Sequence, residues 1–283
     1  MKRQLVTVFA VAAIWAPPQA LAQVRVVADV DYIPAGDYAD KKDRLDIYIP
    51  ANATKAPVIL SIHGGGLRQG DKSGQTFVGQ RLASAGHVTV VVNHRLSPGV
   101  MHPAHIEDIA AAFAWVKKNI ARHGGDPDRI FVIGHSAGAY LAALLVLDPR
   151  YLAAHALQPR DIRGVVPVSA FFYVDRPGVA PDRPKDTWGT DVTVWKAASP
   201  AAYITRNVPP LLLLYADGDD AWWRDQQGEF AAALRKAGAA DVETRVIAGR
   251  THNTVWSEMA KGDEDTSRAI LQFVTRLAKT TSH

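Results

Sequence analysis

The sequence contains no cysteine, and this absence excludes several kinds of chemistry at once. A chain without thiols forms no disulfide bonds, binds no metal through thiolates and has no cysteine nucleophile. Its stability must therefore come from packing, and 48% apolar residues in a chain of 283 are enough for a large core. No Ser/Gly/Pro-rich linker or charge run divides residues 23–283, which predicts a single domain there.

A strong excess of one charge is also missing. The chain has 32 Lys and Arg against 28 Asp and Glu side chains, a net charge of +4. Without Lys2 and Arg3, which belong to the N-terminal segment discussed next, 30 basic side chains remain and the net charge is +2. No basic cluster is interleaved with aromatic residues, so nucleic acid is not expected as a partner.

The N-terminal apolar run is too short to cross a bilayer. Residues 5–15 are apolar, follow a basic start and precede the small-residue site at 20–22. This pattern is typical of a secretory signal peptide. The sequence therefore predicts a signal peptide over residues 1–22, cleavage near Ala22-Gln23, export to a periplasm or the cell exterior, and no membrane span in the mature protein.

Short β-branched runs alternate with longer helical patterns along the rest of the chain. This alternation predicts an α/β fold with a mostly parallel eight-stranded sheet, helices on both faces, and an antiparallel edge made by the first two strands. The expected strands are 24–30, 44–49, 57–63, 88–93, 129–133, 164–169, 211–215 and 242–247, and the expected helices are 75–85, 103–122, 137–147, 221–236 and 265–278.

The pentapeptide GHSAG, at 134–138, stands between a predicted strand and a predicted helix. A side chain at the apex of such a turn is pushed out of the sheet, and its neighbours must be small because bulk would collide with the strand or the helix. Ser136 occupies the apex. We predict that it is a nucleophile, in preference to a serine that only caps the helix.

A serine nucleophile needs a base, and the base needs a carboxylate that orients it. Of ten histidines, His252 alone lies between the last predicted strand and the last helix, and it is the predicted base. Asp217, Asp219 and Asp220 follow the preceding strand, which gives the order Ser, Asp, His of nucleophile-elbow folds. Asp219 is the preferred acid. Asp220 is the second choice and Asp217 the third, and both stay open because only geometry can separate the three.

Acyl transfer also needs hydrogen-bond donors for the negative charge that develops on the carbonyl oxygen. The backbone N–H of Ala137 is one candidate, because it follows the nucleophile at a helix N-terminus. Gly65 and Gly66 are the others, since glycine lets the backbone approach a substrate without a side chain in the way. His63, which begins this loop, is expected to brace it.

The HGGG sequence at 63–66 and the GHSAG sequence at 134–138 resemble those of the α/β-hydrolase superfamily, and within it bacterial carboxylesterases of the hormone-sensitive lipase and feruloyl-esterase-like type. The likeness extends over about residues 43–278. It implies the α/β-hydrolase fold, hydrolysis of small or aromatic esters through a serine acyl-enzyme, and no metal or organic cofactor. The sequence departs from the family at Leu67, where an aromatic residue is common, and at His94, where tyrosine is usual.

Two other functions stay open. The run 219–230 is similar to the acid loop of kynurenine formamidases, which favours Asp219 as the acid and makes an arylformamidase or amidase the first alternative. Export from the cytoplasm argues against that substrate class. A non-catalytic binding protein on the same fold is the second alternative, disfavoured because every catalytic position is filled. His102 and His105 have acidic neighbours, but their place at a helix start does not predict a metal site.

An irregular stretch of about 171–210 interrupts the alternation of strands and helices. A long insertion of this kind commonly forms a pocket wall or a lid. Trp188 in this stretch, Trp222 beside the acid loop, Leu67 after the glycine loop and His135 beside the nucleophile are the predicted pocket residues. Simple packing remains the alternative for the tryptophans.

Overall fold

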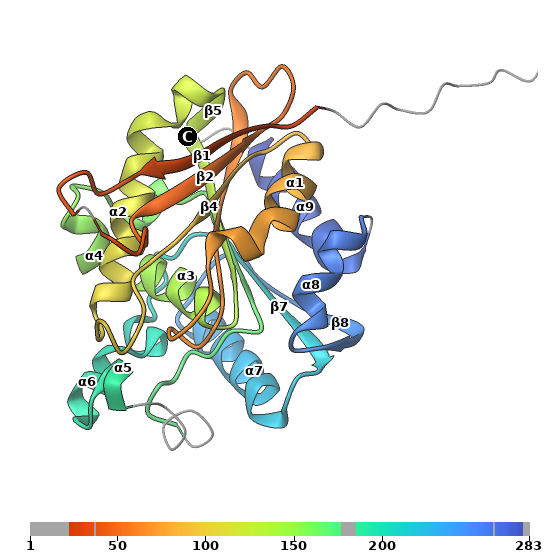
Figure 1. Ribbon diagram of the computed structural model, residues 1–283. Helices are drawn as coiled ribbons and strands as arrows, with labels where there is room; N and C mark the ends of the chain where they lie inside the picture. Colours follow the sequence, from red (N-terminus) through yellow and green to blue (C-terminus); the bar gives the residue numbers. More distant parts are fainter. Residues whose placement is uncertain (1–22, 37, 177–184, 263, 280–283) are drawn as a thin grey trace, which may run out of the picture.

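The computed structural model describes residues 23–36, 38–176, 185–262 and 264–279. Within these ranges, eight strands form one sheet in the order β1-β2-β4-β3-β5-β6-β7-β8 (Figure 1). β1 is antiparallel to β2, β2 is antiparallel to β4, and the other neighbours are parallel. The predicted mostly parallel sheet with an antiparallel edge is confirmed. The predicted signal peptide, residues 1–22, lies outside the described residues.

The strands follow the apolar runs of the sequence, and three of them extend well beyond their predicted ends. Their bounds are β1 Arg25–Asp31, β2 Arg44–Ile49, β3 Ala56–Ile62, β4 Val88–Val92, β5 Gly125–His135, β6 Gly164–Val168, β7 Leu211–Gly218 and β8 Val242–Thr251. β5 begins four residues before its predicted start because Gly125 pairs with Ala56. β7 and β8 are longer than predicted because their ends pair with each other, Gly218 opposite Thr251.

The five predicted helices are present, and several short helical segments lie between them. The helices are α1 Thr76–Ser84, α2 Ala104–Asn119, α3 Ala137–Leu147, α4 Pro149–Ala153, α5 Lys185–Trp188, α6 Val192–Ala197, α7 Ala221–Lys236, α8 Thr254–Ser257 and α9 Asp265–Ala278, with 3-10 turns η1 Lys72–Gln75, η2 Ile120–His123, η3 Pro159–Asp161, η4 Pro200–Tyr203 and η5 Glu258–Lys261. The sequence analysis missed α4 and α8 because four or five residues are too few to show a helical period.

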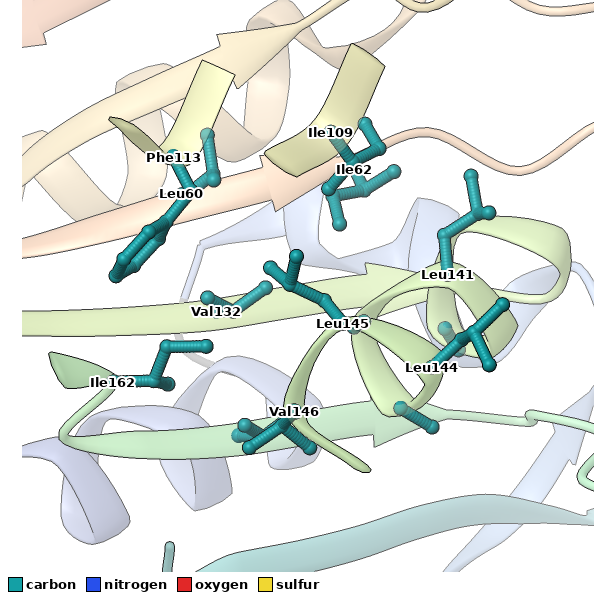
Figure 2. Close-up of a cluster of buried hydrophobic side chains, with 14 of the residues drawn as sticks. Leu60, Ile62, Ile109, Phe113, Val132, Leu141, Leu144, Leu145, Val146 and Ile162 are labelled. Atoms are coloured by element: carbon teal, nitrogen blue, oxygen red, sulfur yellow. The ribbon is translucent and has the colours of Figure 1, made fainter. Parts of the chain in front are cut away.

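Alternate residues of the central strands pack on opposite faces of the sheet. On β3, Ile59 joins the core beneath α1 and α9, whereas Leu60 and Ile62 join the core beneath α2 and α3. Figure 2 shows Phe113 of α2 and Leu145 of α3 within this second core. Full burial of each such side chain contributes about 1.5–3 kcal/mol. Because both faces are covered, the inner parallel strands are apolar and buried through their central residues, whereas the edge strand β8 is mostly exposed.

This arrangement brings functional loops together. The carboxyl ends of β3, β5, β6, β7 and β8 lie at one edge of the sheet because these strands are parallel. The loops that follow them are therefore neighbours in space although they are far apart in sequence. In the described ranges, no helix is both long enough and apolar enough to cross a bilayer.

Candidate active site

Ser136 occupies the turn between β5 and α3 in a backbone conformation that is rare for a non-glycine residue, with φ 54° and ψ −118°. Its backbone N–H donates to the carbonyl of Val168 on β6 at 2.9 Å. A Cβ added to Gly134 would lie 2.5 Å from the carbonyl carbon of Gly138, and one added to Gly138 would lie 2.2 Å from the carbonyl oxygen of Ile62. Such a conformation costs about 1–3 kcal/mol, and the surrounding contacts hold it.

His252, directly after β8, lies between Ser136 and Asp219. Its Nε2 is 3.0 Å from Oγ of Ser136, and its Nδ1 is 2.7 Å from Oδ1 of Asp219. An ionised carboxylate only accepts hydrogen bonds, so Nδ1 carries the proton and Nε2 offers its lone pair to the serine hydroxyl. This arrangement can remove the proton from Ser136 and stabilise the imidazolium that results.

Geometry separates the three aspartates of the acid turn. Asp219 is 3% exposed and is the one that contacts the imidazole. Asp217 is exposed and accepts hydrogen bonds from the backbone N–H groups of Gly249 and Arg250 at 2.9 and 3.1 Å. Asp220 is the exposed N-cap residue of α7. The structure therefore brings Asp219, and neither neighbour, to the predicted base.

The second oxygen of Asp219 has its own donors. Oδ2 accepts from Oγ of Ser169 at 2.6 Å and from the backbone N–H of Ala216 at 3.0 Å. Burial alone would raise the pKa of Asp219, but the hydrogen bonds from His252 and Ser169 outweigh it and hold the pKa below its ordinary value. Ser169 is fully buried with φ 49°. Ser169 was not among the predicted site residues, and its one signal was its place at the end of a predicted strand.

The predicted oxyanion donors lie in the glycine loop after β3 and at the start of α3. Gly65 and Gly66 have φ values of 116° and 65°, which favour glycine. A Cβ on Gly65 would lie 2.1 Å from the carbonyl oxygen of Gln69. In the part of the chain that the structure describes, the backbone N–H groups of Gly65, Gly66 and Ala137 donate to no protein acceptor. They are available for a substrate oxygen.

Two buried histidines support the glycine loop. Nδ1 of His63 is 2.8 Å from the carbonyl oxygen of Gly64, and the His63 ring stacks on His94 with centroids 4.4 Å apart. Burial lowers the pKa of His63 to about 4 and lowers that of His94 well below its ordinary value. Both rings are therefore neutral near pH 7. Nδ1 of His94 lies 2.8 Å from the carbonyl oxygen of Arg95, which fixes the second ring.

A cleft of about 560 Å³ opens at Ser136. Its lining consists of small and polar residues, namely His63, Gly64, Gly65, Gly66, Gln69, Gly70, Asp71, Gly74, Gln75, His135, Ser136, His252 and Asn253. A larger cavity of about 650 Å³ lies at the opposite edge of the sheet, beside Arg25 and His123. It contains none of the predicted site residues, so the cleft at Ser136 is the candidate substrate site.

Two predicted pocket residues lie near the imidazole. His135 lines the cleft, and its Nε2 is 2.6 Å from the carbonyl oxygen of His252. Trp222 is half-buried and contacts Trp223, with ring centroids 4.2 Å apart and ring planes inclined by 31°. The ring of Trp223 lies 4.5 Å from that of His252. Trp223 is therefore in direct contact with the base.

Leu67 and Trp188 lie elsewhere. Each side chain is 1% exposed and belongs to the hydrophobic core, not to the lining of the cleft. Leu67 follows the glycine loop with φ 64°, and its side chain packs inward. Trp188, on α5, packs edge to face against Tyr140 and Phe171. Both residues are corrections to the predicted pocket.

Within the described residues, no three His, Asp or Glu side chains gather where a metal ion could be held. The histidine and carboxylate near the start of α2 have other partners. Nε2 of His105 is 3.1 Å from Oγ of Ser97, and Asp108 forms an ion pair with Arg95 at 2.7 Å. These contacts fix the loop after β4 against α2.

Known proteins similar to this chain are esterases by name. The BD-FAE family model matches residues 45–155. Esterase LipQ of Mycobacterium tuberculosis is 31% identical over 256 residues, which cover 80% of this chain and 56% of the relative. The probable carboxylic ester hydrolase LipM of the same organism is 31% identical over 240 residues, covering 77% and 55%. The chain thus spans about half the length of the curated relatives it matches.

Solved structures share the fold at lower sequence identity. A truncated carbohydrate esterase from gut microbiota has a TM-score of 0.74 and 19% identity, covering 93% of this chain and 99% of that one. Esterase 2 of Thermogutta terrifontis has a TM-score of 0.72 and 23% identity, covering 95% and 100%. These likenesses confirm the α/β-hydrolase fold.

Proposed function

We propose that this chain, whose residues 45–155 match the BD-FAE family model and which has the α/β-hydrolase fold, is a serine esterase that hydrolyses small carboxylic esters. The proposal is carried by the hydrogen-bonded series from Oγ of Ser136 through His252 to Asp219, with distances of 3.0 and 2.7 Å. The esterase names of the relatives favour esters over formamides and over a non-catalytic role.

In the acylation step, Oγ of Ser136 attacks the ester carbonyl carbon while its proton passes to Nε2 of His252. Asp219 accepts from Nδ1–H and stabilises the imidazolium. The carbonyl π electrons move to the oxygen, and the backbone N–H groups of the glycine loop and of Ala137 donate to that oxyanion. The intermediate collapses when His252 gives its proton to the leaving alcohol oxygen, and an acyl-enzyme remains.

Water completes the reaction by the same route. His252 takes a proton from a water molecule whose oxygen attacks the acyl carbon, and a second oxyanion forms in the same place. When this intermediate collapses, the C–O bond to Ser136 breaks and His252 returns the proton to the serine oxygen. The products are a carboxylic acid, an alcohol and the free enzyme, so no oxidant, reductant or metal enters the balance.

We extend the proposal to esters with an aromatic group. The Trp223 ring lies 4.5 Å from the His252 ring and 4.2 Å from the Trp222 ring, so the two indoles place apolar surface beside the base. Methyl cinnamate is then expected to be hydrolysed alongside p-nitrophenyl acetate, and Trp222→Ala is expected to lower kcat/KM for the cinnamate more than for the acetate. Equal effects on both esters would contradict the aromatic preference.

We also propose that residues 1–22 direct export and that residues 23–283 form one domain. The basic start, the apolar run and the small-residue site support this proposal. Protein isolated from the periplasm or the medium of an expressing bacterium should begin near Gln23 when its N-terminus is sequenced. Recovery only from the cytoplasm, with the first residues retained, would contradict export.

Hydrolysis of p-nitrophenyl acetate tests the proposed function. Ser136→Ala is expected to lower kcat by at least about 10⁴-fold, because the nucleophile is lost and only binding and oxyanion stabilisation remain. Ser84→Ala, at an exposed serine of α1, is the matched control and should retain full activity. A wild-type protein inactive on p-nitrophenyl esters of every acyl length, or a Ser136→Ala variant as active as the control, would refute the proposal.

A further inference from the structure

The side chain of Gln75, in the turn before α1, is fixed in one orientation. Its Oε1 accepts from Nε1–H of Trp256 at 3.1 Å and from Oγ–H of Ser61 at 3.4 Å. An indole N–H can only donate, so the amide oxygen must face Trp256 and the NH₂ group must point away from it. These two partners therefore fix which end of the Gln75 amide carries the oxygen. The residue is 7% exposed.

The NH₂ group of Gln75 is left as a donor in the cleft at Ser136. Gln75 is one of the residues that line this cleft. Among the described residues, Nε2 of Gln75 has no hydrogen-bond partner, and it is not one of the side-chain atoms sealed from solvent without a partner. Because this NH₂ group is open to the solvent of the cleft, an acceptor on a ligand can replace water as its hydrogen-bond partner.

His135 presents the complementary acceptor in the same cleft. Its Nε2 lies 2.6 Å from the carbonyl oxygen of His252, so Nε2 carries the proton and Nδ1 offers a lone pair. Burial lowers the pKa of His135 to about 3, so the ring stays neutral. A Cβ on Gly64 would lie 3.3 Å from Nδ1, and the glycine therefore leaves the space beside this nitrogen open.

One indole holds both groups. The His135 ring stacks on Trp256 with centroids 5.7 Å apart and planes inclined by 15°, and the same indole donates to Gln75. The donor and the acceptor are thus positioned relative to each other by Trp256. Fixed groups of this kind discriminate between ligands because they cannot turn toward a second partner.

The position of the pair points to the alcohol side of the ester. The leaving oxygen must lie beside Nε2 of His252, which returns its proton. The His135 ring is 4.9 Å from the His252 ring, and Trp256 lies one helical turn after that base. Resting on the proposed esterase function, we propose that Gln75 and His135 form a subsite for a hydroxyl group on the alcohol portion of the ester, with Gln75 donating to the hydroxyl oxygen and His135 accepting its proton.

Two esters that differ only in hydroxyl groups test the subsite. The readout is the ratio of kcat/KM for glycerol 1-monobutyrate to kcat/KM for propyl butyrate. Gln75→Glu keeps an acceptor for Trp256 and removes the donor, and it should lower this ratio about fivefold. His135→Gln keeps a donor for the His252 carbonyl but places no acceptor at the position of Nδ1, and it should lower the ratio by a similar factor.

Gln69→Glu is the matched control. Gln69 lines the same cleft, but its side chain is exposed, so the variant adds the same charge without removing a fixed donor. It should change kcat/KM for both esters by the same factor and leave their ratio as in the wild type. A cooperative thermal unfolding transition shows whether each variant is folded. If Gln75→Glu does not fold, His135→Gln alone tests the subsite.

Three results would overturn the subsite. The first is an unchanged kcat/KM ratio in both variants, and the second is an equal fall of this ratio in Gln69→Glu. The third is that the variants lower kcat/KM for propyl 3-hydroxybutyrate relative to propyl butyrate, which would place the hydroxyl on the acyl side. Failure of the esterase proposal looks different, because the wild-type protein would then hydrolyse none of these esters. The two proposals can therefore fail separately.

Discussion

Two loops meet at Ser136, and opposite kinds of interaction hold them. In the acid turn after β7, the charged carboxylate of Asp219 accepts hydrogen bonds from His252, Ser169 and Ala216. In the glycine loop after β3, two stacked rings support the backbone, and both are neutral because burial lowers their pKa values. The acid turn thus depends on a carboxylate that stays ionised, whereas the glycine loop depends on imidazoles that stay neutral.

The largest expected effect lies in the acid turn. Asp219→Asn should lower kcat for p-nitrophenyl acetate by about 10⁴-fold, because an amide cannot hold the imidazole in the tautomer that accepts the serine proton. Asp217→Asn and Asp220→Asn are matched controls, since neither carboxylate contacts His252. Losses of similar size in all three variants would show that the turn as a whole, and not one carboxylate, supports the base.

A second effect separates the carboxylate from its support. Ser169→Ala removes a hydrogen bond to a charged group, and kcat should fall about 10- to 100-fold because such bonds are worth about 1.5–3 kcal/mol. The pKa of Asp219 should rise, since one of the hydrogen bonds that hold it down is lost. Ser199→Ala, at another buried serine, should lower the unfolding temperature without lowering kcat. Equal kcat in the two variants would contradict a positioning role for Ser169.

The glycine loop should respond to loss of packing instead of loss of charge. His94→Ala removes the ring beneath His63 and should lower the free energy of unfolding by about 2–4 kcal/mol, the usual cost of emptying a buried site. His94→Phe keeps a stacked ring and should recover most of that loss. Unfolding in urea measures both variants. Equal destabilisation by Ala and Phe would show that the hydrogen bond to the Arg95 carbonyl matters more than the stack.

A smaller effect appears in the dependence of stability on pH. The pKa of His63 is about 4 in the folded protein, below the ordinary 6.5, so as the pH falls the unfolded chain takes up this proton first. The free energy of unfolding should therefore fall between pH 6.5 and 4, by up to about 3 kcal/mol for this ring. Asp219, whose pKa is lowered, loses its contribution only at more acidic pH.

A variant tests whether the stacked histidines cause this dependence of stability on pH. His94→Phe removes one of the two stacked imidazoles, so its free energy of unfolding should depend less steeply on pH in this window than that of the wild type. Asp217→Asn, in the acid turn, should leave the slope between pH 6.5 and 4 unchanged. Parallel slopes in the wild type and His94→Phe would mean that the stack does not determine the acid sensitivity.

The order of elements and the position of the candidate nucleophile could be predicted because local patterns determine them. β-Branched runs form the buried strands, and the small residues around Ser136 leave room for one sharp turn. The place of Asp219 in the loop after β7 was predictable, and the resemblance of this loop favoured it, but only the structure shows that Asp219 contacts His252 while Asp217 binds the backbone of Gly249 and Arg250.

Side-chain direction and pairing across strands could not be predicted. Leu67 belongs to a loop at the site, yet its side chain turns into the core, and sequence position alone does not indicate that. His63 and His94 stack because β3 and β4 are neighbours, with Ile62 opposite Val92. That contact depends on the strand order, in which β4 lies between β2 and β3.

The central claim is that Ser136 is a nucleophile activated by His252. Labelling with a fluorophosphonate, followed by mass spectrometry of the digested protein, tests it directly, because the reagent forms a stable bond only with an activated serine oxygen. The account predicts one phosphonyl group per chain, on the peptide that contains Ser136, and no labelling of Ser136→Ala. A label on another residue, or labelling of Ser136→Ala at the wild-type rate, would contradict it.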